Sequence, residues 1–377
     1  MPHSVVLGLA GAPTVVVEAS LRACRDVLAQ CCDVQGVTGG PRGLMEGAFT
    51  PLGGARLSSV PVAGCQLGSG RHAMTPLGIA SIVDQLEASR IDALVLAGGN
   101  GTMALLEAVD AESRSRNLGL RTIGIPKTID NDLLGVDFSP GFGSAARYLA
   151  LTIPSIARDQ LAMSSMEPIR VVETMGRGTG WLAAAGAAGF ILEKSELVAD
   201  LCLIPESSNM PIPEIFDAVE EALSARSRAF IICSEGFPFP SSRDDYRAIN
   251  HSTLLLGGVA RRLARALQAE FGRSARGEVL GTQQRSSHTF ASAADCECAR
   301  LTGEWAGRYV LEGRSGVMAG TRRVGSDPLA LAIDPIPLAD VASLTKPLPK
   351  EFWPVDSQRR HHFIEWLWPI ISPGVSG

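Results

Sequence analysis

The sequence lacks several features that would place it in a common functional class. No apolar run is long enough to span a membrane, and the N-terminus has no basic segment followed by an apolar run and a small-residue cleavage site. The formal net charge is −5 at pH 7, which argues against a general nucleic-acid-binding protein. These absences predict a cytoplasmic protein with no membrane and no nucleic-acid partner.

Two kinds of motif are also missing. None of the eight cysteines forms a Cys-x-x-Cys pair, so we expect no structural zinc site and mostly reduced, core cysteines. No Gly-x-Gly-x-x-Gly motif opens a helix after the first apolar segment, which disfavours a nucleotide-binding dehydrogenase, and there is no Walker A loop.

What is present is a regular alternation of short apolar segments and amphipathic ones. Ser4–Leu9 has the composition of a strand, a Gly-Ala-Pro-Thr turn follows it, and Val15–Cys32 can form a helix. The same order recurs along the chain. It predicts an α/β fold, with parallel sheets covered by helices on both faces.

The chain is organised around the stretch Ile123–Asp132, Ile-Gly-Ile-Pro-Lys-Thr-Ile-Asp-Asn-Asp. Its apolar start suits a buried parallel strand that Pro126 ends. Ligands bind beyond the carboxyl ends of strands in open α/β sheets. Asp130 could take a proton from a hydroxyl there while Asp132 helps to hold a metal, although a capped turn would have the same residue types.

A second stretch, Ile91–Met103, runs from an apolar strand into the turn Gly98-Gly99-Asn100-Gly101-Thr102. Glycines let backbone N–H groups approach an anion, and a helix N-terminus adds partial positive charge. We expect Thr102 to be the N-cap of a helix that begins at Met103. The turn therefore predicts a phosphate site.

Together these stretches resemble the phosphofructokinase family. Gly98–Thr102 is similar to its Gly-Gly-Asp-Gly-Ser/Thr donor motif, and Pro126–Asp132 to its catalytic motif. Further matches follow in family order between about Leu7 and Gly303: the first donor loop at Gly11, Leu67-Gly68-Ser69-Gly70-Arg71, Met175-Gly176-Arg177, Ser234-Glu235-Gly236, and Leu280-Gly281 with Gln284-Arg285.

The resemblance implies two doubly wound parallel-sheet lobes with the active site in the cleft between them. We assign residues 1–137 and about 252–300 to a phosphate-donor lobe, and residues 138–251 and about 301–325 to a sugar-phosphate lobe. Residues 326–377 form a C-terminal tail in which we recognise no motif. Trp353, Trp366 and Trp368 there suit a packed tail, a subunit contact or a surface wrap equally well.

The resemblance also implies the roles of individual residues. Asp130 would be the base, and Asn100 and Asp132 would organise Mg²⁺ for transfer from ATP or pyrophosphate to a sugar phosphate in a dimer or tetramer. Lys127 and Thr128 would assist catalysis. The donor would be held by Gly11, Arg71, Gly99, Asn100, Gly101 and Thr102, and the sugar phosphate by Thr128, Asp130, Met175, Gly176, Arg177, Glu235, Arg276 and Arg285.

Three positions depart from the family pattern. Asn100 replaces the usual aspartate, and an amide should bind Mg²⁺ more weakly than a carboxylate. Gly101 resembles ATP-using members, whereas Lys127 resembles pyrophosphate-using ones; we favour ATP. Pro168 stands where many bacterial relatives have a phosphate-binding arginine, which leaves the acceptor open. A non-catalytic sugar-phosphate-binding subunit is the competing interpretation.

Overall fold

The computed structural model describes residues 2–52, 57–72, 74–194, 196–208, 210–239 and 257–372. They form two compact units, each drawn from separate stretches of the chain. The first unit comprises Met1–Ser144, Arg285–Lys346 and Ser372–Gly377, and the second comprises Ala145–Gln284 and Pro347–Ile371. No helix in the described part of the chain is long and apolar enough to cross a membrane.

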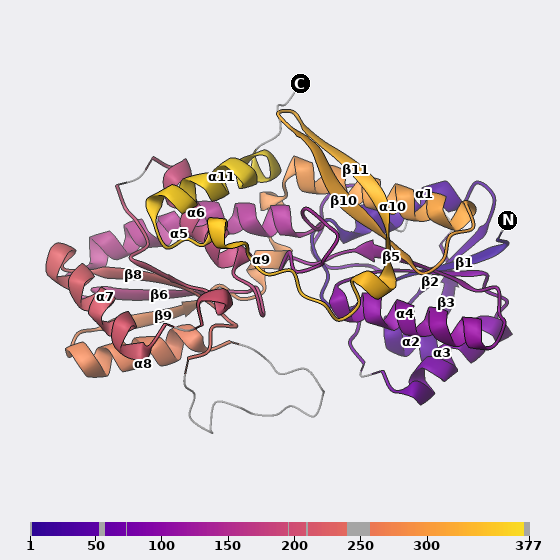
Figure 1. Ribbon diagram of the computed structural model, residues 1–377, viewed down its shortest axis with the longest axis horizontal. Coiled ribbons are helices and arrows are strands. Elements are labelled where there is room, and N and C mark those ends of the chain that lie inside the picture. Colours follow the sequence, from indigo (N-terminus) through magenta and orange to yellow (C-terminus); the bar gives the residue numbers. More distant parts are fainter. Residues whose placement is uncertain are drawn as a thin grey trace. The chain divides into compact units, whose positions relative to one another are not determined.

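The first unit is built on a seven-stranded sheet with the order β11-β10-β5-β4-β1-β2-β3 (Figure 1). Its central strands are parallel, and antiparallel partners lie at both edges, where β3 pairs with β2 and β11 with β10. The strands are β1 (Ser4–Leu9), β2 (Asp33–Val37), β3 (Phe49–Pro51), β4 (Ala93–Gly98), β5 (Arg121–Pro126), β10 (Val317–Ser326) and β11 (Leu329–Pro337).

Helices cover both faces of this sheet, as the alternation in the sequence predicts. Successive β4 side chains point to opposite faces: Val95 packs with residues of α1 and α10, whereas Leu94 and Leu96 pack with residues of α3 and α4. The helices of the unit are α1 (Val17–Leu28), α2 (Pro41–Glu46), α3 (Pro76–Ala88), α4 (Asn100–Ser115) and α10 (Ala293–Leu311), and α9 (Gln283–Ser286) crosses the unit boundary.

The second unit has a four-stranded parallel sheet with the order β7-β8-β6-β9. Residues of α7 and α8 share one core cluster with its strands. The strands are β6 (Ile169–Thr174), β7 (Leu201–Leu203), β8 (Ala229–Ser234) and β9 (Ala275–Val279), and the helices are α5 (Phe142–Met163), most of which lies in this unit, α6 (Trp181–Leu192), α7 (Ile212–Arg226), α8 (Val259–Phe271) and α11 (Ser357–Ile371).

The tail is packed rather than loosely wrapped. The rings of Phe352, Phe363 and Trp366 cluster around Trp181 of α6, with centroid distances to it of 6.1, 6.3 and 5.2 Å. Trp368, in contrast, is 47% exposed. Short 3₁₀ turns accompany the main elements at Pro205–Ser207, His288–Phe290, Leu338–Asp340 and Lys350–Phe352.

The two units follow different boundaries from the lobes expected from the sequence. Strand β9 pairs with β6, so this part of 252–300 belongs to the second unit. Helix α10 packs against β5 and α1, and β10 pairs with β5, so residues 301–325 belong to the first. The expected 326–377 tail is divided between the units, because β11 completes one sheet while α11 packs on α6.

The expected start of one helix is wrong. The carbonyl of Gly99 accepts hydrogen bonds from the backbone N–H groups of Thr102 and Met103, so α4 begins at Asn100 and Thr102 lies in its first turn. Helix α5 begins at Phe142, and the Ser144 hydroxyl in its first turn donates to Asp295.

Candidate functional site

The two motif loops of the first unit follow neighbouring parallel strands. Gly98 at the end of β4 is paired with Pro126 at the end of β5, and the Lys127 N–H donates to the Gly98 carbonyl at 3.0 Å. A Cβ atom on Gly98 would lie 1.9 Å from the Thr102 hydroxyl oxygen, so only glycine allows the chain to turn into α4 here. The glycine turn and the catalytic stretch therefore leave the sheet at the same edge.

Side chains join these two loops. The Asn100 Nδ2 donates to the Asp132 carboxylate at 2.9 Å and to the Asp132 carbonyl at 3.4 Å. The other polar atom of this amide, Asn100 Oδ1, is buried, and no described residue donates a hydrogen bond to it. A buried oxygen of this kind is expected to accept from a ligand that the protein alone does not supply.

Asn100 and Asp132 fit a magnesium ion. Mg²⁺ prefers oxygen ligands and commonly takes one or two carboxylates from the protein, with water and substrate phosphates completing its shell. No group of three or more His, Cys, Asp or Glu side chains suited to a metal occurs within the described residues. An ion here would thus depend on the Asp132 carboxylate, the Asn100 carbonyl oxygen and the oxygens of a phosphate donor.

Asp130 lies in the same loop and is 9% exposed. Its backbone N–H donates to the Thr128 hydroxyl at 3.1 Å. Asn131 is fully buried with φ of 52°, and its side-chain carbonyl accepts from the Ser139 N–H at 3.1 Å. Asn131 thus has a left-handed backbone conformation between Asp130 and Asp132, and its buried hydrogen bond holds the loop in this conformation.

Lys127 connects the catalytic loop to the first loop of the chain. Its buried ammonium donates to the Ala12 carbonyl at 2.7 Å. Burial lowers the pKa of Lys127 to about 8; Asp130 and Asp132 oppose this shift, whereas Arg71 and Arg285 reinforce it. This cation can therefore lose its proton close to neutral pH.

Other residues expected to hold the donor lie around this lysine. The Gly11 N–H donates to the Gly70 carbonyl at 3.0 Å, so the loop at Gly11 contacts the residue that precedes Arg71, whose side chain is exposed. A Cβ atom on Gly101 would meet no atom within 4 Å, so the space above this first-turn residue of α4 is open. The first unit contains Gly11, Arg71, Gly99, Asn100, Gly101, Thr102, Lys127, Thr128, Asp130 and Asp132. Arg285, which was expected to bind the sugar phosphate, belongs to the same unit, and its charge reinforces the lowered pKa of Lys127.

The second unit brings together a separate group at the carboxyl ends of β6 and β8. Met175, Gly176 and Arg177 follow β6, and Glu235 follows β8. The Glu235 carboxylate accepts from the Arg177 N–H at 3.1 Å. A Cβ atom on Gly236 would lie 1.6 Å from the Arg177 carbonyl oxygen, so the Glu-Gly pair requires glycine for this close approach.

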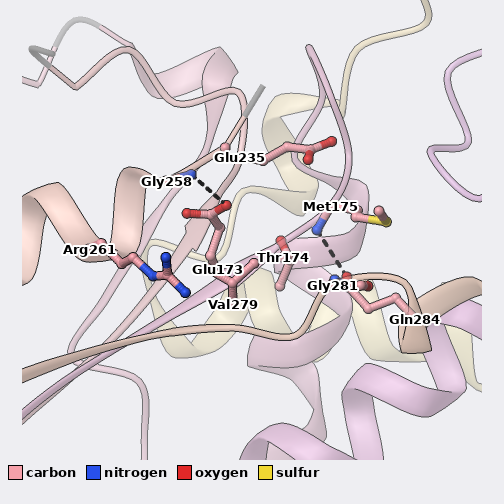
Figure 2. Close-up of a pocket in the computed structure, with 10 residues that line it drawn as sticks. Glu173, Thr174, Met175, Glu235, Gly258, Arg261, Val279, Gly281 and Gln284 are labelled. Carbon is pink, nitrogen blue, oxygen red and sulfur yellow. Dashed lines mark hydrogen bonds between the residues drawn. The ribbon is translucent and has the colours of Figure 1, made fainter. Parts of the chain in front are cut away.

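A cavity of about 370 Å³ lies beside this group, and Figure 2 shows the residues that line it. Burial raises the pKa of Glu235, and the nearby charge of Glu173 adds to the shift. The cavity is lined by Glu173, Thr174, Met175, Glu235, Gly257, Gly258, Arg261, Val279, Gly281 and Gln284. It is of a size that suits a small ligand.

Arg276 does not join this group. It lies near the amino end of β9, opposite Arg170 of β6, whereas the cavity is at the carboxyl ends. Its guanidinium pairs with Glu167 and Glu278, each at 3.2 Å. Within its own unit, Arg276 is thus separated from the residues with which it was expected to bind the sugar phosphate.

Two residues that support these groups have no recognisable signal in the sequence. Lys346, from the tail, donates its N–H to the Asp132 carbonyl at 2.8 Å and its ammonium to the Val136 and Asp137 carbonyls at 2.9 Å each. Burial lowers the pKa of Lys346 to about 7. Glu173, within β6, accepts from the N–H groups of Gly258 and Ala260 at the start of α8. Isolated charges of this kind have no local sequence signature.

Comparisons with known proteins identify the family of the chain. The sequence model of the family described as "Phosphofructokinase" matches residues 5–306. A sulfofructose kinase from Alkalicoccus urumqiensis is 32% identical over 377 residues, covering 99% of this chain and 97% of the relative. A pyrophosphate–fructose 6-phosphate 1-phosphotransferase from Halomonas elongata is 32% identical over 261 residues, covering 68% of this chain and 61% of the relative.

The fold is also similar to that of a solved structure. A pyrophosphate-dependent phosphofructokinase from Nitrosospira multiformis superimposes with a TM-score of 0.84 at 24% identity, covering 98% of this chain and 92% of the other. Because the family model matches residues 5–306 and one relative matches over almost the whole chain, the chain belongs to the phosphofructokinase family.

Proposed function

We propose that the protein is a Mg²⁺-dependent phosphotransferase that moves the terminal phosphoryl group of ATP to the 1-hydroxyl of fructose 6-phosphate or a related anionic ketose. The observation that carries this proposal is the hydrogen bond between Asn100 and Asp132, because it joins the glycine turn to the loop that bears Asp130. Phosphoryl transfer depends mainly on alignment and charge neutralisation, and these loops provide both kinds of group.

The roles follow from the chemistry of each side chain. Asp130 accepts the proton of the acceptor hydroxyl as its oxygen bonds to phosphorus and the bond to the leaving group breaks. Lys127 and Arg71 bind donor oxygens, and the N-terminal turn of α4, with Gly101 and Thr102, binds the donor as a helix N-terminus binds an anion. Mg²⁺ held by Asn100 and Asp132 would neutralise charge on the donor.

The residues of the second unit are assigned to the acceptor. Glu235 and the segment Met175–Arg177 can bind hydroxyl groups, because a carboxylate and backbone groups face the same cavity. Fructose 6-phosphate is the first candidate. A sulfonated fructose is the second, because a relative that matches over almost the whole chain is named a sulfofructose kinase.

Pyrophosphate is the alternative donor, and Lys127 favours it. A buried ammonium next to the donor loop suits a compact, highly charged donor, and several relatives are named as pyrophosphate-dependent. The open space above Gly101 supports ATP instead, because it leaves room for a larger nucleotide. We retain ATP as the first choice.

A matrix of donors and acceptors with Mg²⁺ tests the proposal. ATP and pyrophosphate are each combined with fructose 6-phosphate, 6-deoxy-6-sulfofructose and fructose. We expect turnover with ATP and an anionic ketose, and its loss in Asp130→Ala with an unchanged melting temperature. Turnover with pyrophosphate alone would reverse the choice of donor. Near-wild-type turnover of Asp130→Ala would refute the assignment of the base.

Binding without turnover is the remaining outcome. If calorimetry shows that a sugar phosphate binds and no donor supports transfer, the protein is a non-catalytic sugar-phosphate-binding subunit, the competing interpretation of the Asn100 substitution. Wild-type turnover with either donor excludes this alternative.

A further inference from the structure

We propose that Arg261 binds the anionic group of the acceptor, a phosphate or a sulfonate on the carbon farthest from the reacting hydroxyl. This inference rests on the proposed function, because it assigns the acceptor to the cavity that contains Met175 and Glu235. It adds a residue that determines specificity, and the sequence motifs contain no sign of it.

The first step is the charge of the cavity wall. Its charged lining residues are Glu173, Glu235 and Arg261, so Arg261 is the one cation among the described lining residues. In Figure 2 its side chain extends from α8 toward Glu173 and Val279. Arg261 is exposed, and the structure shows no ion pair between it and another described residue. Its guanidinium is therefore available to a ligand in the cavity.

The second step is that the two carboxylates have other partners. Glu173 is 2% exposed, and its two oxygens accept from Gly258 and Ala260 at the N-terminus of α8, at 3.0 and 2.9 Å. Glu235 accepts from the Arg177 N–H and, with its raised pKa, suits a hydroxyl donor better than a second anion. Neither carboxylate neutralises Arg261 through a described ion pair.

The third step is the position of Arg261 in its helix. It lies in the first turn of α8, where the helix dipole disfavours a cation, and this turn contains no acidic residue. Helix stability therefore does not explain an arginine here. The adjacent Arg262 has a structural partner, because its guanidinium donates to the Gly257 carbonyl at 3.1 Å. Arg261 has no such partner among the described residues.

The fourth step is that no second arginine is among the described residues that line this cavity. Arg276 is paired with Glu167 and Glu278 and does not line it. Position 168, where an arginine would be expected from the family resemblance, is a proline. A guanidinium binds phosphate or sulfonate oxygens through two parallel hydrogen bonds. Arg261 can thus bind the anionic group of an acceptor in this cavity.

The experiment compares Arg261→Gln with Arg265→Gln. Arg265 is exposed one turn further along the same helix and does not line the cavity, so it is a matched control. KM and kcat are measured for fructose 6-phosphate, 6-deoxy-6-sulfofructose and fructose. Calorimetry measures binding of the two anionic sugars without a donor.

Loss of one charge-assisted contact should raise KM and Kd for the anionic sugars about tenfold to a hundredfold in Arg261→Gln. We expect little change in kcat, little change with fructose, and no change in Arg265→Gln. Arg261→Lys should recover part of the affinity, because it keeps the charge and loses the planar pair of donors. A larger effect on one anionic sugar identifies whether phosphate or sulfonate is preferred.

Three results would overturn the inference: unchanged affinity for both anionic sugars in Arg261→Gln, an equal loss with fructose, or an equal loss in Arg265→Gln. Failure of the proposed function gives a different pattern. In that case the wild-type protein turns over no sugar with either donor, and the binding measurements alone decide the role of Arg261. If the wild-type protein then binds neither anionic sugar, the inference is also wrong.

Discussion

Replacing Asn100 by aspartate tests how the two motif loops are joined. The wild-type amide donates to the Asp132 carboxylate at 2.9 Å. The variant has almost the same shape, but it removes this donor and places a second carboxylate beside the first. Like charges at this separation repel, so the loops should be held together less firmly when no cation is bound.

The magnitude follows from two contributions. Loss of the hydrogen bond costs about 1 kcal/mol. Two unit charges about 4 Å apart repel by about 4 kcal/mol at an effective dielectric constant of about 20, and partial exposure of Asp132 reduces this figure. We therefore expect a loss of about 2–4 kcal/mol, which lowers the melting temperature by on the order of 10 °C.

The assay is thermal unfolding in EDTA and across a Mg²⁺ titration, at pH 5 and pH 8. Repulsion raises the folded-state pKa of the carboxylate pair, so stability is lost as pH rises through that pKa, and the effect should be larger at pH 8. Added Mg²⁺ should stabilise Asn100→Asp more than the wild type, because two carboxylates bind the ion more tightly than one. Asn100→Ala is the control, since it loses the donor and gains no charge.

Two results would refute this reasoning. An Asn100→Asp protein that melts at the wild-type temperature in EDTA at pH 8 would show that the two side chains do not approach each other. An Asn100→Asp protein that is destabilised in EDTA and gains no more than the wild type from Mg²⁺ would refute the metal site and leave the loop geometry intact.

Two further predictions concern Lys127 and the packing of the first unit. Because the pKa of Lys127 is lowered to about 8, its ammonium is charged below that pH, and KM for the donor should rise as pH rises through about 8. The variant Lys127→Met should have a high KM for the donor that does not depend on pH. A wild-type KM that is unchanged between pH 7 and 9 would contradict this role. A Cβ atom on Gly303 of α10 would lie 2.0 Å from the Ser20 carbonyl oxygen of α1, so Gly303→Ala should lower the free energy of unfolding in urea by about 1–3 kcal/mol. Gly119→Ala is the control and should change it little, because a Cβ atom on Gly119 would meet no atom within 4 Å. Equal urea midpoints for both variants would show that the two helices can separate freely.

The sequence predicted the elements with local signals well. The strand Ala93–Gly98, for example, is a continuous apolar run ended by glycine, and this run predicts both its type and its end. The meeting of the two loops could also be predicted, since consecutive parallel strands place their carboxyl ends at one edge. The start of α4 could not, because the Gly99 carbonyl begins the helix before the expected cap.

What the sequence could not predict depends on contacts between distant segments. Strand β9 was assigned to the wrong unit because its five residues have no alternating pattern that favours one sheet over another, and its pairing with β6 decides the matter. Lys346 shows the same limit. It lies in a tail without motifs, and only the folded chain brings its ammonium to the carbonyls of Val136 and Asp137.

Asn100 and Lys346 together change how the departure from the family pattern should be interpreted. With aspartate at position 100, two carboxylates would face each other and would need a cation to hold them together. In this chain the Asn100 amide bonds to the Asp132 side chain, and Lys346 bonds to the Asp132 carbonyl and to two further carbonyls of the same loop. The loop is therefore positioned by the protein itself. Under the proposed function, Mg²⁺ would be needed for the charge of the donor phosphates rather than for the shape of the site, so the asparagine favours a metal that binds together with the donor over a site that has lost its function.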